Sequence, residues 1–494
     1  MQDRTAIASP SAGRFTFLLG LVLLIVLGVH LIYDHDRLLG DPDSWWHITL
    51  GADILASGHL PVTDAYSYTY EGKPFIAKEW LAQIILALAY GAGGWNGVAL
   101  LTAAVAVAAL LVFYLELARN LQPSAAAVLA VITALLLSPV LVARPHVFTL
   151  PLIAILTIRL YRASDAARPP EFWLLGLITL WSNLHGSFTL AFVIAGFAFL
   201  NAVERAGLSN RTLLVKWIVF LVLCPLAALL HPYGIEPLKI SAGMAAGNEA
   251  MTLISEWQPL NPNDDKILEY ALLATLAGLI GAGLRLGWSK TLFIVFALHM
   301  FLTHVRFLYV FFLLVPLVIA GEIAGRYPAI SMASWKSRGR DRLEGLAIAW
   351  FRPLAAAVVS ATVLAAAVFM VKYPIVPPEA RSVETALAFA KSNGLTGGRV
   401  FNNYNYGGTL IFHRIKTFID GRAEQLFLGE FFSEFANSGA PGGEKLLGEI
   451  LDRYQVSWTL LSVRDTRPAF LDGMAGWKRV YTDDYAVIHV RTAP

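Results

Sequence analysis

The chain has 494 residues, of which 56% are hydrophobic and only 15% are charged, and its mean hydropathy is +0.59. Soluble domains carry about 25% charged residues, so this composition predicts an integral membrane protein and excludes an ordinary soluble domain. The net charge of +3 is too small to favour a nucleic-acid partner. The single cysteine, Cys224, excludes an intrachain disulfide.

The first apolar run, residues 15–33, is long and lacks a small-x-small cleavage site at its end, so we interpret it as an uncleaved signal anchor. A helix needs about 20 mostly apolar residues to cross a bilayer. On this basis the sequence predicts about 11 crossings, at residues 15–33, 95–116, 124–142, 147–161, 171–184, 187–203, 213–230, 268–285, 291–304, 307–324 and 348–371.

The basic residues predict the orientation of these helices, because Lys and Arg concentrate in cytoplasmic loops. Those that fall on one predicted side are Arg4, Arg14, Arg119, Arg159, Arg162, Arg168, Arg205, Arg211, Lys216, Arg285, Lys290, Arg326, Lys336, Arg338, Arg340 and Arg342. The other side receives residues 34–79, residues 235–266 and everything after Lys372. We therefore expect a bacterial inner-membrane protein with a cytoplasmic N-terminus and a periplasmic C-terminal domain.

The domain organisation follows from a change in pattern near residue 372. Residues 1–372 are expected to form a transmembrane domain with a first exoplasmic loop at 34–94, and residues 373–494 a water-soluble domain. In the latter we expect helices at 378–393 and 445–453 and strands at 399–402, 409–413, 417–420, 458–461 and 486–490. The predicted fold class is an α-helical polytopic membrane protein with a C-terminal soluble α/β domain.

The first loop contains the sequence "GDPDSWWHITLGADILASG". Pro42 disfavours a helical conformation at Asp41, which makes Asp41 a candidate N-cap of a helix that runs to about Ser57 and ends at Gly58. One stripe of this helix carries Trp45, Ile48, Ala52 and Leu55. Such a stripe predicts a helix that lies along the membrane surface, and residues 77–90 predict a second interfacial or re-entrant helix.

Asp41, Asp43 and His47 are the candidate chemical groups of this loop. Asp43 and His47 are four residues apart and share a helical face, with Asp41 at the start of the helix. Paired carboxylates beside an imidazole can act as a general base on an acceptor, or hold a divalent cation such as Mg²⁺ or Mn²⁺. The alternative is structural: Asp41 only caps the helix, Asp43 complements its dipole, and His47 is an interfacial side chain.

Other polar residues are predicted to lie on the same side, close to membrane depth: Arg144, His146, Asn183, His185, His231, Glu256, Trp257, His304 and Arg306. Ionisable residues are costly there and are candidates for function, although the arginines can also snorkel and the histidines can be satisfied interfacial residues. Together they predict one exoplasmic cavity. Its two arginines would suit a phosphate, because guanidinium binds phosphate oxygens bidentately.

In the soluble domain, "FNNYNYGG" and "FIDGR" stand out. The rings of Tyr404 and Tyr406 could stack on an acceptor sugar or peptide, and Asp420 and Arg422 could be offered to the acceptor from a loop. The alternatives are a Gly-Gly bend and an Asp-Gly turn with a structural ion pair.

This layout resembles the GT-C superfamily, membrane glycosyltransferases that use polyprenyl-phosphate or polyprenyl-diphosphate sugars. The first-loop sequence is similar to the Asp-Pro motif of oligosaccharyltransferase catalytic subunits, and this resemblance implies that Asp41 is a metal ligand or a base. "NYNYGG" resembles their Trp-Trp-Asp-Tyr-Gly acceptor motif at Tyr406 and Gly407, with Asn405 in place of Asp. Their acidic second-loop motif has no counterpart here.

The sequence therefore predicts a hexosyl- or pentosyltransferase that moves a sugar from a lipid-linked donor to an exoplasmic glycan, lipid or protein, in contact with membrane lipids. Asp41 or Asp43 would deprotonate the acceptor or bind a cation, and Arg144 and Arg306 would neutralise the leaving phosphate. The pocket would be shaped by His185, His231 and Glu256. Two rival functions stay open: a transporter or flippase, and a non-catalytic envelope scaffold.

Overall fold

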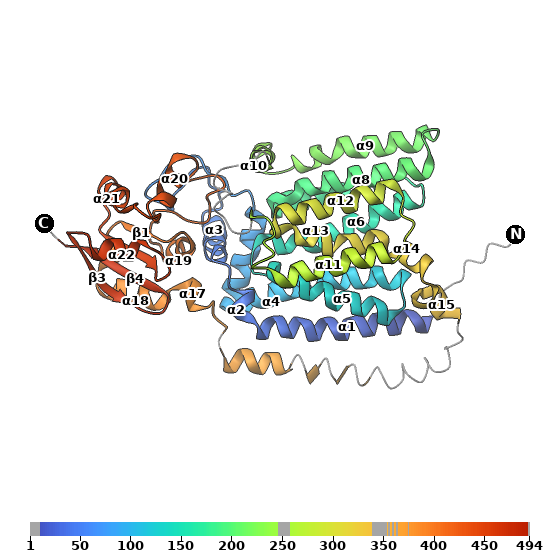
Figure 1. Cartoon of the computed structure of the whole chain (residues 1–494), viewed down its shortest axis with the longest axis horizontal. Coiled ribbons are helices and arrows are strands. Elements are labelled where there is room, and N and C mark those ends of the chain that lie inside the picture. Colours follow the sequence, from blue (N-terminus) through green and yellow to red (C-terminus); the bar gives the residue numbers. More distant parts are fainter. Residues whose placement is uncertain are drawn as a thin grey trace.

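A computed structural model describes residues 10–245, 257–337, 364–373 and 375–492, with 353, 356–357 and 360–361. Most of its helices lie side by side along the long axis of the molecule, as Figure 1 shows. The C-terminal part, with its small sheet, sits at one end of this bundle.

The bundle and the segments next to it are formed by the helices from α1 to α15. The helices are α1 (Pro10–Tyr33), α2 (His35–Leu38), α3 (Asp43–Ser57), α4 (Trp80–Asn120), α5 (Pro123–Leu137), α6 (Thr149–Asp165), α7 (Leu174–Leu184), α8 (Thr189–Ala206), α9 (Arg211–Ala228), α10 (Glu236–Ala245), α11 (Lys266–Gly281), α12 (Trp288–Thr303), α13 (Leu308–Phe312), α14 (Leu314–Arg326) and α15 (Met332–Ser337). Short 3₁₀ turns precede α6 and α8, namely η2 (Pro145–Phe148) and η3 (Gly186–Phe188).

Among the described residues, six helical segments are long and apolar enough to cross a membrane: Trp80–Asn120, Pro123–Val140, Pro145–Asp165, Gly186–Ala206, Arg211–Ala228 and Val305–Arg326. The apolar helices α7 and α12 are shorter. The chain is thus built as a multi-pass membrane protein. The count of about 11 crossings stays a prediction, and most of the segment predicted at residues 348–371 lies outside the described residues.

A buried ion cluster joins the bundle helices at the end away from the C-terminal part. The ammonium of Lys290 lies 2.9 Å from Asp165 Oδ2 and 2.8 Å from Glu322 Oε1, and Arg205 approaches the same Glu322 carboxylate at 3.4 Å. A buried charge is tolerated only when it is paired, so this cluster ties α6, α8, α12 and α14 together. Loops predicted to be cytoplasmic therefore meet at one end of the bundle.

The C-terminal part contains α17 (Glu379–Ser382), α18 (Glu384–Ser392), α19 (Gly407–Phe412), α20 (Glu430–Asn437), α21 (Glu444–Arg453), α22 (Arg467–Asp472), β1 (Val400–Asn402), β2 (Trp458–Ser462), β3 (Trp477–Thr482) and β4 (Ala486–Arg491). Its sheet has the order β1-β2-β4-β3, in which β1 and β2 are parallel and the other neighbours antiparallel. The prediction that this part combines helices with a small sheet is confirmed.

Three local predictions for this part are wrong. Residues 409–413 form most of helix α19 rather than a strand, because this apolar segment packs against α3. Residues 417–420 make only an isolated bridge, between Thr417 and Ser67. The helix expected at 378–393 is broken at Val383, which has a positive φ of 45°.

Helix α3 lies between the bundle and the C-terminal part (Figure 1). It begins at Asp43 with Pro42 as its N-cap, one residue after the predicted cap, and ends at Gly58 with φ 70° as predicted. The predicted membrane-facing stripe is wrong. Trp45 and Ile48 are buried against the bundle, whereas Ala52 and Leu55 are exposed.

The contact between α3 and α4 is close because one residue has no side chain. A Cβ at Gly51 would lie 2.0 Å from the backbone oxygen of Gln83. Helix α4 itself is kinked at Gly93 and Gly94, so its first segment is set apart from the membrane-crossing one. This matches the predicted helix at 77–90, whose position relative to the membrane stays a prediction.

The first loop and the C-terminal part share one hydrophobic core. Trp46, Leu50 and Phe75 of the loop pack in the same cluster as Phe418 and Ile419. Polar contacts also stabilise this interface. The Arg414 guanidinium donates two 2.7 Å hydrogen bonds to the Asp53 carboxylate. The Gln425 amide bonds to both the backbone N–H and the backbone oxygen of Ile76. The loop is therefore held in a fixed position by residues more than 300 positions later in the chain.

Candidate functional site

Asp41 and Asp43 are clamped together by one guanidinium. Arg144 places Nη1 3.2 Å from Asp41 Oδ2 and Nη2 2.5 Å from Asp43 Oδ2. Asp41 Oδ1 accepts the backbone N–H of Asp43 at 2.8 Å, and Asp43 Oδ1 accepts the indole N–H of Trp46 at 3.0 Å. Each of the four carboxylate oxygens therefore has a donor, and Asp41 supports the start of α3 as a capping residue does.

Two glycines of the C-terminal part let it approach this clamp. A Cβ at Gly408 would lie 2.1 Å from the backbone oxygen of Pro42, and one at Gly421 would lie 1.8 Å from Asp43 Oδ1. Neither distance is compatible with a side chain. Gly408 of "NYNYGG" and Gly421 of "DGR" are therefore explained by the close contact of their backbone with the Asp-Pro-Asp segment.

The residues present do not fit a divalent cation at Asp41 and Asp43. Magnesium and calcium need about six oxygen ligands, and here the guanidinium of Arg144 occupies the space between the two carboxylates. Within the part of the chain that the structure describes, no group of three His, Cys, Asp or Glu side chains could hold a metal ion. The two aspartates are therefore best described as the partners of the Arg144 guanidinium.

A second carboxylate, Glu79 at the start of α4, faces α3 at His47, one turn beyond Asp43. Its Oε2 is 3.8 Å from His47 Nε2, and its Oε1 is 3.4 Å from both His185 Nε2 and the backbone nitrogen of Gly186. Sequence reasoning missed Glu79 as a site residue. The only signal was an acidic residue directly before a long apolar helix, since its histidine partners are distant in sequence.

Burial controls the protonation of this cluster. It holds the pKa of both His47 and His185 well below the ordinary 6.5, and nearby cations lower these pKa values further, among them Arg144. Burial also raises the pKa of Glu79, which the charge of Lys78 opposes. The cluster is therefore a carboxyl group between two neutral imidazoles.

The neighbours of Glu79 hold the start of α4 in place. The ammonium of Lys78 pairs with Glu424 of the C-terminal part at 2.7 Å. The backbone oxygen of Lys78 accepts a hydrogen bond from His231 Nε2 at 3.1 Å, because Nδ1 of that ring already accepts the backbone N–H of Tyr233. His231 therefore holds the backbone of Lys78 and Tyr233 in place, and both of its ring nitrogens are used for this and not for Glu79.

Two further predicted residues border the cluster. The His146 ring centroid is 6.1 Å from that of His185, and its Nε2 donates to the backbone oxygen of Val140 at 2.5 Å. The guanidinium of Arg306 lies 4.3 Å above the Trp257 ring, and its charge contributes to the lowered pKa of His185. The predicted pocket residue Glu256 lies outside the described residues.

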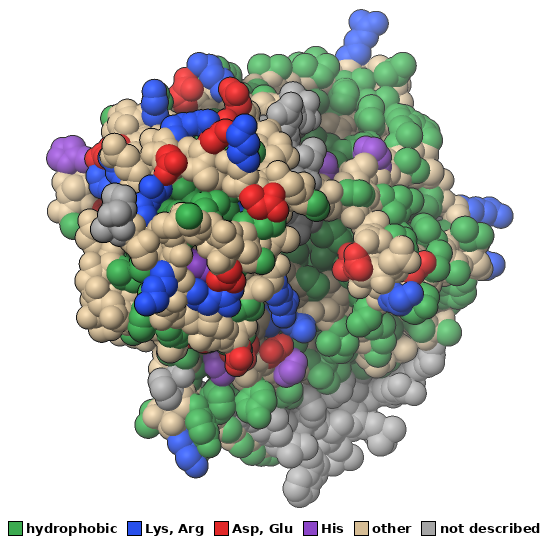
Figure 2. All heavy atoms as spheres, turned by 60° about the vertical axis from the view of Figure 1, so that its left-hand side comes forward, with side chains coloured by type: hydrophobic (Ala, Val, Ile, Leu, Met, Phe, Trp, Pro, Cys, Tyr) green, Lys and Arg blue, Asp and Glu red, His purple; other side chains and the backbone are tan. Residues whose placement is uncertain are grey.

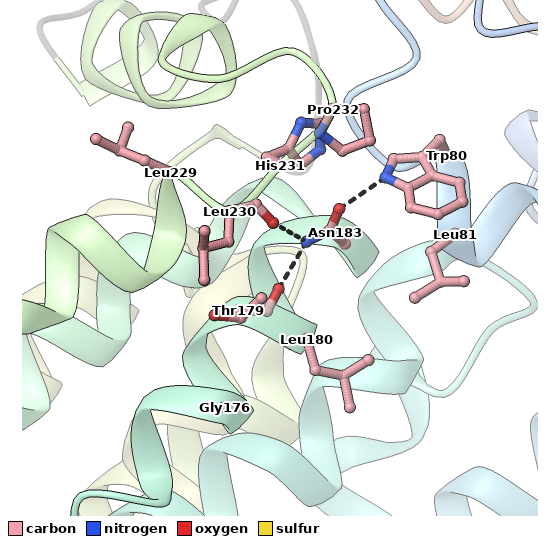
Figure 3. A pocket seen from close by; sticks show the side chains of 10 residues that line it. All are labelled: Trp80, Leu81, Gly176, Thr179, Leu180, Asn183, Leu229, Leu230, His231 and Pro232. Atoms are coloured by element: carbon pink, nitrogen blue, oxygen red, sulfur yellow. Dashed lines mark hydrogen bonds between the residues drawn. The ribbon is translucent and has the colours of Figure 1, made fainter.

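A shallow, open cavity of about 730 Å³ lies beside the cluster, between α7, the end of α9 and the start of α4 (Figure 3). Leucines line much of it. The amide of Asn183 forms its polar floor: Oδ1 accepts the indole N–H of Trp80 at 2.8 Å, and Nδ2 donates to the backbone oxygens of Thr179 and Leu230. Because Trp80 directly follows Glu79, the cavity and the ionic cluster adjoin at the start of α4.

The acceptor-side predictions fall mostly on buried residues. Asp420 and Arg422 are 0% and 1% exposed and bonded to each other, and Arg422 also pairs with Asp64 of the first loop at 2.5 Å. Tyr406 is 3% exposed and donates to the backbone oxygen of Tyr485. Tyr404 is half-buried, with its ring near Phe432. These contacts are those of the structural ion pair and turn considered as alternatives.

The structure thus brings six predicted residues together, from three separate parts of the chain: Asp41, Asp43, His47, Arg144, His146 and His185. Figure 2 shows acidic and basic side chains gathered on the C-terminal part and at its junction with the bundle, whereas hydrophobic side chains dominate the bundle surface. Polar chemistry is concentrated where these two parts meet.

No protein-family model and no curated protein sequence matches the chain. Its structure is similar to the oligosaccharyltransferase of Archaeoglobus fulgidus, with a TM-score of 0.48 and 14% identity over 89% of this chain and 69% of that one. It is also similar to the arabinofuranosyltransferase AftD from Mycobacteria, with a TM-score of 0.48 and 14% identity over 96% of this chain and 40% of that one. Both names are those of sugar-transferring enzymes, the class that the sequence resemblance predicts.

Proposed function

We propose that this protein is a membrane glycosyltransferase that moves a hexosyl or pentosyl group from a polyprenyl-phosphate or polyprenyl-diphosphate carrier to an exoplasmic acceptor. One observation carries the proposal: the buried ionic cluster around Glu79 and an apolar cavity lined by the next residue, Trp80, lie next to each other at the start of α4. A lipid-linked sugar has the same division, with a hydrocarbon tail and a charged headgroup at the bilayer edge.

Each part of the site has a role in this proposal. The leucine-lined cavity takes the first part of the prenyl tail, and Asn183 and Trp80 close its polar end. Arg306 and Lys78 offer positive charge to the phosphate, which loses its sugar and gains charge as the bond breaks. Arg144 keeps Asp41 and Asp43 paired and so fixes the start of α3.

The orientation belongs to the same proposal. The ionic cluster and the C-terminal part would face the periplasm of a bacterial inner membrane, so that the acceptor glycan, lipid or protein arrives from that side. The rival transporter expects paired halves and charges at the membrane midplane. The clusters described here lie at the two ends of the bundle instead.

The test uses the full chain in lipid nanodiscs, supplied with undecaprenyl-phosphate-linked radiolabelled hexose or pentose and a membrane extract as acceptor. We expect labelled product and release of undecaprenyl phosphate. The variant Gly176→Phe places a ring in the cavity, and it should raise the KM for the donor at least tenfold. Gly278→Phe adds the same ring at an exposed helix glycine with open space around it and serves as the control.

Three results would contradict this proposal or part of it. Label that crosses proteoliposome membranes on its intact carrier, without transfer, would support the flippase instead. An unchanged KM in Gly176→Phe would remove the cavity from the donor site. Binding of envelope proteins without either activity would favour the scaffold.

A further inference from the structure

Glu79 occupies an unusual place for a carboxylate. Only 9% of its side chain is exposed, and it faces two imidazoles, His47 on α3 and His185 at the end of α7. Its contacts are long: 3.8 Å and 3.4 Å to the two Nε2 atoms and 3.4 Å to the backbone nitrogen of Gly186. Hydrogen bonds that hold a carboxylate firmly are usually about 2.7–2.9 Å long.

The hydrogen bonds of His185 determine which of its two ring nitrogens carries the proton. Its Nδ1 lies 3.1 Å from the backbone nitrogen of Ser187, which can only donate. Nδ1 is therefore an acceptor, and in the neutral ring Nε2 carries the proton and directs it at Glu79. His185 has no free lone pair with which to take a proton from a substrate, whereas Glu79 has several.

Asp41 and Asp43 do not offer the same capacity. Each of their four oxygens has a donor, and two of those donors belong to Arg144, which cannot give up its charge in a protein. Protonating the oxygen that faces Arg144 in either aspartate would cost one charge-assisted bond to the guanidinium. The oxygens of these carboxylates are therefore less available to a substrate proton than those of Glu79.

We propose that Glu79 is the general base of the transfer reaction, a role that rests on the glycosyltransferase function proposed above. The acceptor hydroxyl or amide loses its proton to the Glu79 carboxylate while its oxygen or nitrogen bonds to the sugar C1. The bond from C1 to the carrier phosphate oxygen breaks, and its electron pair leaves with the phosphate. His47 and His185 are positioning residues that aim the carboxylate.

The surroundings of Glu79 suit this role. The charged and titratable groups that face it are His47 from α3, His185 from the turn before α8, Lys78 beside it, Arg144 before η2 and Glu424 of the C-terminal part. Burial raises the pKa of Glu79, so its carboxylate holds a proton more readily than one in water. The most exposed of these neighbours are Glu424 and Arg144, whose side chains are 26% and 22% exposed, so the cluster lies nearest the surface on their side.

The experiment compares Glu79→Gln, Glu79→Asp and the control Glu71→Gln in the nanodisc assay with the undecaprenyl-phosphate sugar. Glu71 is an exposed acid of the same loop, paired with Lys416. A positioned general base contributes about 10²–10⁴-fold to a rate, so Glu79→Gln should lower kcat at least 100-fold and leave the donor KM within about twofold. Glu79→Asp should retain part of the rate, and Glu71→Gln should retain all of it.

A pH profile separates a chemical role from a structural one. For the native chain, kcat should rise with pH as Glu79 loses its proton, and this limb should be absent in the residual activity of Glu79→Gln. A Glu79→Gln variant that keeps the native rate and the native limb overturns the role of Glu79 but leaves the transferase proposal intact. No transfer by the native chain overturns both. Because the limb is measured on the native chain, the test stands even where a variant fails to fold.

Discussion

Two carboxylate sites lie side by side at the start of α3, and they are satisfied in opposite ways. At the first, Asp41 and Asp43 share the charge of Arg144, at distances of 3.2 and 2.5 Å. At the second, Glu79 lies between two imidazoles that burial keeps neutral, with no contact to them shorter than 3.4 Å. The difference indicates a division of labour: the paired aspartates hold the loop in place, and the loosely held glutamate is left able to exchange a proton.

The largest effect should come from Arg144→Gln, which breaks the first site. Removing one partner of a buried ion pair typically costs about 3 kcal/mol or more, because the other charge stays buried without compensation. Two aspartates would lose their partner here. We expect the free energy of unfolding to fall by about 3 kcal/mol, measured by thermal unfolding in nanodiscs.

Glu79→Gln is the matched variant for the second site. It removes a charge that has no short partner, so we expect its stability to stay within about 1 kcal/mol of the native chain. Equal losses in the two variants would show that both carboxylate sites are structural, and the proposed division would then be wrong.

The first site was more predictable from sequence than the second. Pro42 and Gly58 predicted the bounds of α3 through backbone conformation, which depends on near neighbours. Arg144 was assigned to the same cavity from its side of the membrane. Glu79 meets His185 across 106 positions and comes from a sequence with no distinctive spacing, so nothing local marks it.

The same limit explains the errors in the C-terminal part. Residues 409–412 are apolar and partly β-branched, which favours a strand locally, yet they form helix α19 because that helix packs on α3. The "DGR" turn looked available to a substrate, whereas Arg422 is buried between Asp420 and Asp64. A partner 358 positions away decides the role of that arginine, and local pattern does not contain this information.

A medium effect is expected where the C-terminal part presses on the first site. Gly421→Ala would place a Cβ 1.8 Å from Asp43 Oδ1, so the carboxylate or the turn must move. Overpacking of this kind costs about 1–3 kcal/mol, and we expect a loss of about 2 kcal/mol together with reduced transfer. Gly397→Ala is the control, because a Cβ there meets no atom within 4 Å. If the two variants unfold at the same temperature, the contact between "DGR" and the aspartates does not stabilise the protein.

The smallest effect is a change in the pH dependence of stability at the second site. His185 has a pKa held below 6.5 in the folded chain by burial, so below pH 6.5 the unfolded chain takes up a proton that the folded chain does not. Stability therefore falls as pH falls through this window. Glu79 acts with the opposite sign: its raised pKa makes stability fall as pH rises above 4.5 toward the folded value.

We expect the unfolding temperature of His185→Gln to decline less than that of the native chain between pH 6.5 and more acidic pH, and that of Glu79→Gln to decline more. His59→Gln, at an exposed histidine of the same loop, should leave the profile unchanged. If the two variants shift the profile in the same direction, Glu79 and His185 do not titrate as a carboxyl group beside a neutral imidazole, and the contrast with the arginine-paired aspartates is lost.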